Sequence, residues 1–381
     1  MKRRVAYVAT SAPTDRATWS GSTYHIARCL GDHVGPLEWI GPLRQQHKLA
    51  LRARQIMSMM LAGRWRLLDR EPIVLKGYAR QAAALIAGLN VDFVFSPSTL
   101  PVAHLECRQP IFFWTDATFA AMLGFYLNRD VITDNCIRDA NAAERAALER
   151  CRLAIYSSDW AARSAIDHYG VDSKKVKVLP FGANLETERT FEQIRAMIAS
   201  RPGDRCRLLF VGVDWIRKGG DIALAVAQRL NEEGLRTELT VVGCEPKIDR
   251  TMPTFVRPIG YLKKTTAEGR SSLESLYAES HFLILPSRAE TFGLVLAEAC
   301  AFGLPCVASS VGGIPTIVRN GLNGMTFDMT NIEAVCKYVE GLMADRRRYE
   351  QLALSAFDEY EKRLNWDVAG KTIRTLIEEY L

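Results

Sequence analysis

Short runs of β-branched and aromatic residues alternate with longer amphipathic stretches along nearly the whole chain. Short apolar runs are typical of buried strands, whereas apolar positions three and four apart indicate helices. In the first half the expected strands are Val5–Thr10, Leu37–Ile40, Val91–Ser96, Ile111–Thr115, Leu153–Ser157 and Val176–Leu179. In the second half they are Arg207–Val211, Glu238–Val242, Thr254–Pro258, Phe282–Leu285 and Cys306–Ala308.

The stretches between these strands predict helices. They are Thr23–Leu30, Tyr78–Leu89, Ala140–Glu149, Trp160–His168, Asp221–Glu232, Ser272–Ala278, Phe292–Ala301 and Ile332–Met343. Strands that alternate with helices at this spacing form parallel sheets flanked by helices. The sequence therefore predicts an α/β protein with two such modules.

The boundary between the modules is expected after Asn184, because the segment up to Asp204 has no strand character and ends in the breaker cluster 201–204. We expect a first Rossmann-like module over residues 1–185, a linker over 186–205 and a second Rossmann-like module over 206–362. The final segment, 363–381, is expected to form a helix that packs back on the first module.

The composition changes this picture little. With 48% hydrophobic residues and a mean hydropathy of −0.05 the chain can bury a core, which excludes a wholly disordered protein. The uncharged apolar runs are too short for a transmembrane helix, and the short run after Arg4 is expected to be a strand and not a signal peptide. We therefore expect a cytoplasmic protein.

The nine cysteines form no C-x-x-C pair and the histidines show no spacing typical of metal ligands. We therefore expect reduced thiols and no metal site.

Charge is concentrated between Pro42 and Arg80, which hold nine bases and two acids, a surplus of seven against six for the whole chain. Interleaved apolar residues, such as Leu49, Met60 and Trp65, predict helices with an apolar and a cationic side. Two interpretations of residues 44–80 stay open: peripheral attraction to an anionic membrane or a phosphorylated acceptor, or a solvated helix whose apolar side is core. Nucleic acid is not expected, because no aromatic stacking module accompanies the charge.

The most informative stretch runs from Leu285 to Glu298. A buried strand ends there, a loop carries Glu290, and a helix is expected to start at Phe292–Gly293. Backbone N–H groups at a helix start bind anions such as a diphosphate, and Gly293 lets a ligand approach the main chain. Two carboxylates eight residues apart add hydrogen-bond acceptors on either side, which suits a nucleotide sugar.

A second loop of similar design lies upstream. The strand that ends at Val211 is followed by Arg217 and Lys218 and then by a glycine-rich helix start. These adjacent bases are placed to neutralise a diphosphate, where the charge of a leaving group develops. The stretch 309–315, with Gly312 and Gly313, supplies another glycine-rich turn.

In their order along the chain these motifs resemble the retaining glycosyltransferases of family four, which have the GT-B fold. The resemblance covers 208–366 and rests on F-V-G…R-K-G, V-V-G, I-G-Y, P-S-x-x-E-x-F-G-x-x-x-x-E-A with its E-x7-E core, V-G-G-I-P, N-G-x-N-G and a late N-W. It implies two Rossmann-like domains that face each other across a cleft. The first, 1–185, would bind the acceptor and the second, 206–362, the nucleotide sugar.

The resemblance also implies residue roles. Glu290 would hold the transferred sugar near its reacting carbon, and Lys218 with Arg217 would clasp the diphosphate. The expected donor-binding residues are Glu298 on the ribose and Thr291, Phe292, Gly293, Leu294, Gly243, Ile259 and Tyr261 around sugar, phosphate and base. The expected acceptor and phosphate loop in the first domain consists of Ser20, Gly21, Ser22 and Asp116.

Two departures from the family pattern concern these residues. Most members have arginine directly after the strand glycine, where this chain has Val213 after Gly212, so Arg217 is a candidate for the missing guanidinium. Many members also carry a first-domain histidine near the place that Asp116 occupies. Asp116 is thus either a site residue or the N-cap of the following helix.

The family uses no metal or cofactor, and a nucleotide-diphosphate sugar is the co-substrate. The implied function is retaining transfer of a sugar from a UDP- or GDP-linked donor to a hydroxyl of a glycan, glycolipid or small molecule. One alternative is an inverting GT-B enzyme with His25 as base, and another is a nucleotide-sugar-binding protein without turnover. A nicotinamide dehydrogenase is disfavoured because no G-x-G-x-x-G follows the first strand, and a GT-A enzyme because no D-x-D triplet is present.

Overall fold

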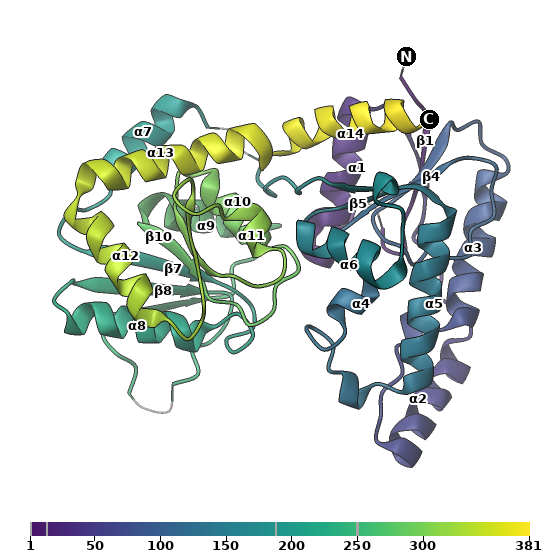
Figure 1. Cartoon of the computed structure of the whole chain (residues 1–381), viewed down its shortest axis with the longest axis horizontal. Helices are drawn as coiled ribbons and strands as arrows, with labels where there is room; N and C mark the ends of the chain where they lie inside the picture. The colour runs from purple at the N-terminus through teal and green to yellow at the C-terminus, as the bar shows by residue number, and fades with distance from the viewer. Residues whose placement is uncertain (1, 13, 187–188, 249–250) are drawn as a thin grey trace. The chain divides into compact units, whose positions relative to one another are not determined.

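The computed structural model describes residues 2–12, 14–186, 189–248 and 251–381 (Figure 1). They form two compact units. Unit 1 comprises the chain up to Pro180 together with Ala369–Leu381, and unit 2 comprises Phe181–Val368. Each unit has its own parallel six-stranded sheet with helices around it, so the predicted α/β class with two Rossmann-like modules is confirmed.

The sheet of unit 1 consists of β1 (Val5–Val8), β2 (Leu37–Ile40), β3 (Phe93–Ser96), β4 (Ile111–Thr115), β5 (Cys151–Tyr156) and β6 (Val176–Val178). Its strand order is β2-β1-β3-β4-β5-β6, and all neighbours are parallel. Every residue of β1, β3 and β4 is buried. Central strands of a parallel sheet are covered on both faces, which is why they read as continuous apolar runs.

The principal helices of unit 1 are α1 (Ser22–His33), α2 (Lys48–Ala62), α3 (Pro72–Ile86), α4 (Phe119–Met122), α5 (Asp134–Arg150) and α6 (Asp159–Tyr169). Side chains of α3, α5 and α6 complete the core. Tyr78 and Ala82 of α3 pack with Val94 of β3, and Ala161 of α6 packs with Ala154 of β5.

The final helix, α14 (Trp366–Tyr380), belongs to unit 1 from Ala369 onward. In Figure 1 it lies beside α1. A Cβ at Gly370 would stand 2.0 Å from the His33 ring, so glycine allows the two helices to approach closely. At the far end of α14 the Tyr380 hydroxyl donates to the Lys174 carbonyl, and its own carbonyl accepts from the Arg152 guanidinium. Residues 369–381 thus belong to unit 1, whereas 363–368 belong to unit 2.

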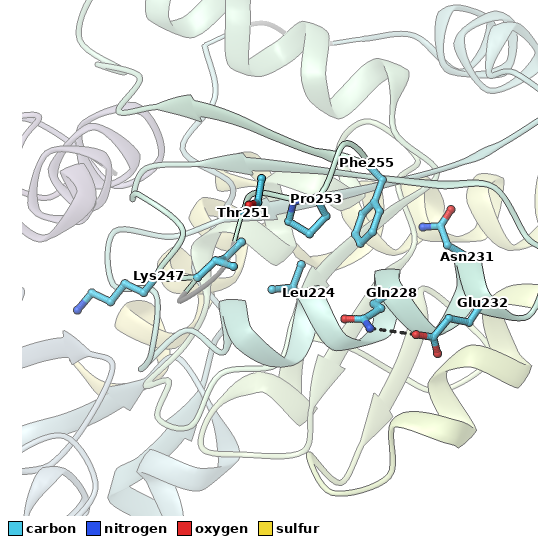
Figure 2. Close-up of a pocket in the computed structure, with 9 residues that line it drawn as sticks. Leu224, Gln228, Asn231, Glu232, Lys247, Thr251, Pro253 and Phe255 are labelled. Atoms are coloured by element: carbon cyan, nitrogen blue, oxygen red, sulfur yellow. Dashed lines mark hydrogen bonds between the residues drawn. The ribbon is translucent and has the colours of Figure 1, made fainter.

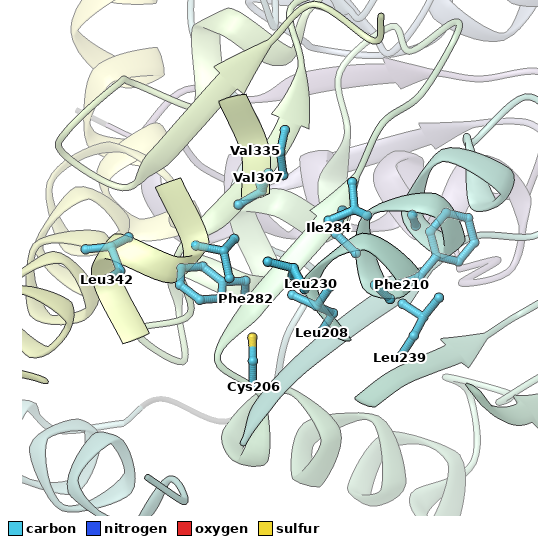
Figure 3. Packing of buried hydrophobic residues seen from close by; sticks show 14 of the residues in the cluster. Cys206, Leu208, Phe210, Leu230, Leu239, Phe282, Ile284, Val307, Val335 and Leu342 are labelled. Carbon is cyan, nitrogen blue, oxygen red and sulfur yellow. The ribbon is translucent and has the colours of Figure 1, made fainter. Parts of the chain in front are cut away.

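The sheet of unit 2 consists of β7 (Cys206–Val211), β8 (Thr237–Val242), β9 (Val256–Gly260), β10 (Phe282–Leu285), β11 (Cys306–Ser309) and β12 (Gly324–Phe327). Its strand order is β12-β11-β10-β7-β8-β9, and all neighbours are parallel. Figure 3 shows the core beside β7 and β10, where Phe210 and Ile284 pack with residues of the covering helices.

The principal helices of unit 2 are α7 (Phe191–Ser200), α8 (Gly220–Glu232), α9 (Ala267–Glu279), α10 (Leu294–Cys300), α11 (Ile314–Ile317), α12 (Ile332–Ala344) and α13 (Arg346–Arg363). Helix α7 falls where a linker over 186–205 was expected. It begins with a capping box at Thr190 and Gln193, and it buries Ile194 and Ile198 in the core of unit 2. Residues 187 and 188 of that range lie outside the described residues.

Helix α2 corrects one interpretation of the basic region. Its apolar residues are not core, because among the described residues of α2 only Leu51 is buried, whereas Leu49, Ile56, Met57, Met60 and Leu61 are exposed. Among the residues that the structure describes, no helix is both long and apolar enough to cross a bilayer.

Candidate functional site

The candidate site of unit 2 lies where the carboxyl ends of β7, β8, β10 and β11 meet at one edge of the sheet. Ligands of open parallel sheets bind at this edge. Backbone hydrogen bonds join the loops that follow these strands: the Arg288 N–H donates to the Arg217 carbonyl at 2.7 Å, and the Gly313 N–H donates to the Glu290 carbonyl at 3.1 Å. The three loops singled out in the sequence are therefore neighbours in space.

Glycines at two positions allow these loops to approach so closely. A Cβ at Gly219, which has a φ of +77°, would stand 2.0 Å from the Pro286 carbonyl oxygen. A Cβ at Gly313 would stand 2.1 Å from the Thr291 carbonyl oxygen. Both distances are shorter than any real contact, so a larger residue would force the β10–α10 loop to move.

Glu290 and Lys218 form an ion pair at the centre of the edge, between the Glu290 Oε2 and the Lys218 Nζ. Both side chains are almost fully buried. Lys218 reaches Glu290 by lying across Gly212, where a Cβ would stand 2.9 Å from the Lys218 Cγ. The strand glycine thus makes room for the lysine, and the structure brings together the two residues expected to act on sugar and diphosphate.

Arg217 reaches the same loop from the β7 side. Its Nη1 donates to the Ala289 carbonyl at 3.3 Å, and its Nε lies 3.7 Å from the Asp214 carboxylate. The guanidinium is therefore adjacent to Glu290. Val213, which directly follows Gly212, is exposed.

Glu298, on α10, is completely buried. Its two oxygens accept hydrogen bonds from the Lys264 Nζ at 2.7 and 2.6 Å, and the Tyr277 hydroxyl donates to Oε2 at 2.9 Å. Burial raises the pKa of Tyr277 well above its usual range, and the nearby Glu298 carboxylate raises it further. The second acid of the motif is thus fixed by a lysine from the β9–α9 loop and a tyrosine from α9.

The other expected donor-binding residues lie at the same edge. Helix α10 starts at Leu294, with Gly293 as its N-cap at a φ of +97°, while the Phe292 ring is buried 5.2 Å from the Phe181 ring. Helix α10 thus starts one to two residues later than the predicted start at Phe292–Gly293. Gly243 follows β8 directly, and its N–H donates to the Gly260 carbonyl at 2.9 Å. That bond places Gly243 beside Ile259 of β9 and the exposed Tyr261.

Sequence reasoning missed Lys264 and Arg288. Arg288 donates to both oxygens of Asp221, at 2.8 and 2.7 Å, and thereby joins the β10 loop to the start of α8. Hydrogen bonding from the Arg288 guanidinium holds the pKa of Asp221 below its usual range. The opposite charges of Arg288 and Asp221 would have predicted this ion pair from the sequence only if β10 were known to lie beside β7.

The expected acceptor loop lies in unit 1, between β1 and α1. Trp19, Ser20 and Gly21 have φ values of 51°, 55° and 83°, so three successive residues are left-handed, two of them not glycine. Such backbone conformations cost free energy and cluster at functional sites. Ser22 is the first residue of α1, and His25 lies one turn on, with its Cδ2 3.6 Å from where a Gly21 Cβ would be.

Asp116 meets this loop, because its Oδ2 accepts a hydrogen bond from the Trp19 indole at 3.1 Å. The helix that follows, α4, is capped by Thr118, whose hydroxyl accepts from the Ala121 N–H. The N-cap interpretation of Asp116 is therefore wrong. Asp116 belongs structurally with Ser20, Gly21 and Ser22.

Unit 2 also has a surface hollow that lies apart from the candidate site. A hollow of 770 Å³ lies between α8 and the β8–β9 connection. It is lined by Leu224, Gln228, Asn231, Glu232, Lys247, Ile248, Thr251, Pro253 and Phe255 (Figure 2). None of the predicted site residues lines it, so it is not the candidate site. Within the described ranges, no group of three or more His, Cys, Asp or Glu side chains is placed to hold a metal ion.

Whole-chain structural similarity is shared with solved GT-B proteins. Sucrose-phosphate synthase from Thermosynechococcus elongatus superposes with a TM-score of 0.70 at 16% identity, covering 99% of both chains. HepE from Anabaena, solved in complex with UDP-glucose, superposes with a TM-score of 0.63 at 14% identity, covering 99% of this chain and 100% of that one. At such identities the likeness shows the fold, which is GT-B.

Sequence similarity to curated proteins covers a little more than half of the chain. A D-inositol 3-phosphate glycosyltransferase from Xylanimonas cellulosilytica is 29% identical over 226 residues, covering 57% of this chain and 54% of that protein. Its counterpart from Thermomonospora curvata is 32% identical over 243 residues, covering 58% and 54%. The match spans little more than half the length of these relatives. Residues 193–358, nearly all of unit 2, match the family described as "Glycosyl transferases group 1".

Proposed function

We propose that the protein is a retaining glycosyltransferase that moves a sugar from a nucleotide-diphosphate donor, UDP- or GDP-linked, to a hydroxyl acceptor in glycan, glycolipid or cell-surface polysaccharide synthesis. The observation that carries the proposal is the buried Lys218–Glu290 pair beside Arg217, at the edge where ligands of such sheets bind. The match of this half of the chain to group 1 glycosyl transferases supports it.

The charges at this edge suit a diphosphate leaving group. Lys218 and Arg217 would stabilise the negative charge that develops on the departing phosphate oxygen, and the backbone N–H groups at the start of α10 would add donors. Glu290 would accept hydrogen bonds from sugar hydroxyls near the reacting carbon. Glu298, already oriented by Lys264 and Tyr277, would accept hydrogen bonds from the ribose.

Retention follows when the acceptor hydroxyl attacks the face that the diphosphate leaves. The bond from the anomeric carbon to the phosphate oxygen breaks, the bond to the acceptor oxygen forms, and the acceptor's proton passes to a leaving-group oxygen. No side-chain nucleophile is needed. The residues then act by positioning the reactants and stabilising charge. The first-unit loop of Ser20, Gly21 and Ser22, with Asp116, would serve the acceptor.

The substrates to test first come from the similar proteins. The curated relatives are named for inositol 3-phosphate, and HepE was solved with UDP-glucose, so a UDP-sugar and a hydroxylated, phosphorylated acceptor head the series. We further propose that the protein works in the cytoplasm and contacts the inner membrane face through residues 44–80. The concentration of bases there supports this.

Nucleotide release from UDP-, GDP- and ADP-sugars, measured with the purified protein, tests the proposal. Lys218→Ala and Glu290→Ala are expected to lower transfer about 100-fold or more, because each removes a group that acts on the reacting centre. Lys337→Ala and Glu232→Ala, exposed positions elsewhere in unit 2, are the matched controls. Unchanged rates in the site variants, with melting as in the wild type, would defeat the assignment.

The anomeric configuration of the product, read by NMR, separates the remaining alternatives. A retained configuration supports the proposal, whereas an inverted one would point to His25 as a base. Donor binding without product under every acceptor would indicate a nucleotide-sugar-binding protein.

A further inference from the structure

Helix α2 presents its apolar side to solvent. Leu49, Ala53, Ile56 and Met60 follow one another at spacings of four, three and four residues, which places them along one stripe of the helix. Leu49 is 84% exposed, Ile56 60% and Met60 81%. An amphipathic helix of a globular protein normally turns this stripe inward, and α2 does the opposite.

The inward side of α2 is held by polar contacts. Besides the buried Leu51, Gln55 accepts a hydrogen bond from the Arg66 N–H at 2.9 Å, and the Ser58 hydroxyl donates to the Arg64 carbonyl at 2.7 Å. These bonds fix the rotation of the helix about its axis. The outward direction of the apolar stripe is therefore built into the fold.

The stripe continues into a wider apolar surface. Met57 and Leu61 widen it along the helix, and the half-exposed Trp65 follows just after the helix ends. Together with Leu49, Ile56 and Met60 these residues form what we call the α2 surface. Contiguous exposed apolar patches on a protein mark interaction sites.

Cations flank the α2 surface. Lys48 and Arg52 lie on α2 beside the stripe, and in the part of the chain that the structure describes neither takes part in an ion pair. Glu71, one of two acids in this region, is buried and engaged by Arg66 at 2.6 Å, so it does little to offset the surface charge. The region therefore joins an exposed apolar stripe to a positive field.

We propose that the α2 surface lies in the interfacial layer of an anionic bilayer, with its apolar side chains among the upper acyl chains and its bases at the headgroups. Apolar residues that include tryptophan, with lysine and arginine alongside, are the features of interfacial helices. A second copy of the chain fits worse, because a two-fold contact would bring Lys48 and Arg52 against bases of the same surface. This inference rests on the membrane contact proposed above for residues 44–80 and adds to it the exposed apolar stripe of α2, and it does not depend on sugar transfer.

Vesicle co-sedimentation of the full chain tests the proposal. We expect tight binding to phosphatidylcholine vesicles that contain about one third phosphatidylglycerol, and much weaker binding to phosphatidylcholine alone. Leu49→Ser combined with Met60→Ser is expected to lower the affinity at least about tenfold. The matched control combines Leu85→Ser and Val178→Ser, which are exposed apolar residues of unit 1 outside α2, and should bind as the wild type does.

A second pair of variants tests the charge. Arg52→Gln is expected to weaken binding about fivefold, whereas Arg163→Gln, an exposed base on α6, changes it less than about twofold. The proposal is overturned if wild-type protein ignores anionic vesicles, or if the Leu49/Met60 variant binds as well as its control. It is also overturned if the wild type sediments as a dimer that this variant converts to monomer, because a second copy would then cover the surface.

Discussion

The ion pair between Lys264 and Glu298 makes a measurable contribution to the free energy of unfolding. A carboxylate that is completely buried is tolerated because a lysine and a tyrosine hydroxyl satisfy it. Replacing Lys264 leaves that charge without its cation. Lys264 is itself partly exposed, so the loss is smaller than for a pair in the deep interior.

We expect Lys264→Met to lower the free energy of unfolding of unit 2 by about 2 kcal/mol. Urea unfolding followed by fluorescence measures it. Lys263→Met, at the exposed neighbouring position, is the control and should lie within about 0.5 kcal/mol of the wild type. Equal midpoints for the two variants would mean that Lys264 does not stabilise Glu298.

His281 makes unit 2 sensitive to acid. The ring is buried, and its Nδ1 accepts from the Arg207 N–H at 3.0 Å, while Nε2 lies 2.9 Å from the Pro202 carbonyl oxygen. Burial lowers the pKa of His281 to about 4. In the unfolded state the imidazole has its ordinary pKa of about 6.5. The free energy of unfolding that comes from keeping His281 neutral is therefore fully present above about pH 6.5 and is lost as the pH falls from about 6.5 to about 4.

The expected loss over this range is about 3 kcal/mol from His281 alone. It is measured by thermal melting of wild type and His281→Asn across the range. Asparagine can accept the Arg207 hydrogen bond but does not titrate. The melting temperature of the variant should therefore change less with pH, although at neutral pH it is below that of the wild type. Parallel profiles would show that His281 is not the group responsible.

At the scale of elements, the existence of most strands and helices could be predicted because each carries a local signal. β12 lacked one: Gly324 and Thr326 interrupt its apolar pattern, and it becomes a strand through pairing with β11. Helix α7 was assigned to a linker although Ile194 and Ile198 have helical spacing.

The motifs located Glu290 and Glu298, but the residues that contact these two carboxylates depend on which strands are neighbours. Local sequence does not specify strand order, so Lys264 and Arg288 were missed.

The close loop packing at the sheet edge leads to an element-level prediction. Gly313→Ala would press a methyl group against the Thr291 carbonyl and displace the β10–α10 loop that carries Glu290. We expect at least about a tenfold loss of donor affinity, measured by calorimetry, because a shift of about 1 Å in a site has such effects. Gly341→Ala, in α12 where a Cβ meets nothing, should keep the affinity and gain about 0.5 kcal/mol of stability. Equal affinities would contradict the prediction.

At the scale of the whole molecule, unit 1 is built from both ends of the chain. Helix α14 buries Ile373 and Ile377 completely. Deletion of 369–381 is therefore expected to destabilise unit 1 by at least about 3 kcal/mol while unit 2 still melts as before. Scanning calorimetry, with limited proteolysis to assign the transitions, measures this. A chain that ends at Tyr380 is the control, and a deletion that left both transitions in place would refute the expectation.

The same discontinuity has a consequence for synthesis on the ribosome. The polypeptide leaves the exit tunnel from its amino end, so the strands of unit 1 emerge first, yet the residues of α14 that complete this unit emerge only after the whole of unit 2. Unit 2 lies in a single uninterrupted stretch and can finish folding earlier. The unit whose synthesis starts first is thus completed second, and until α14 has emerged the apolar surface that Ile373 and Ile377 cover stays open to solvent, where chaperones can recognise it.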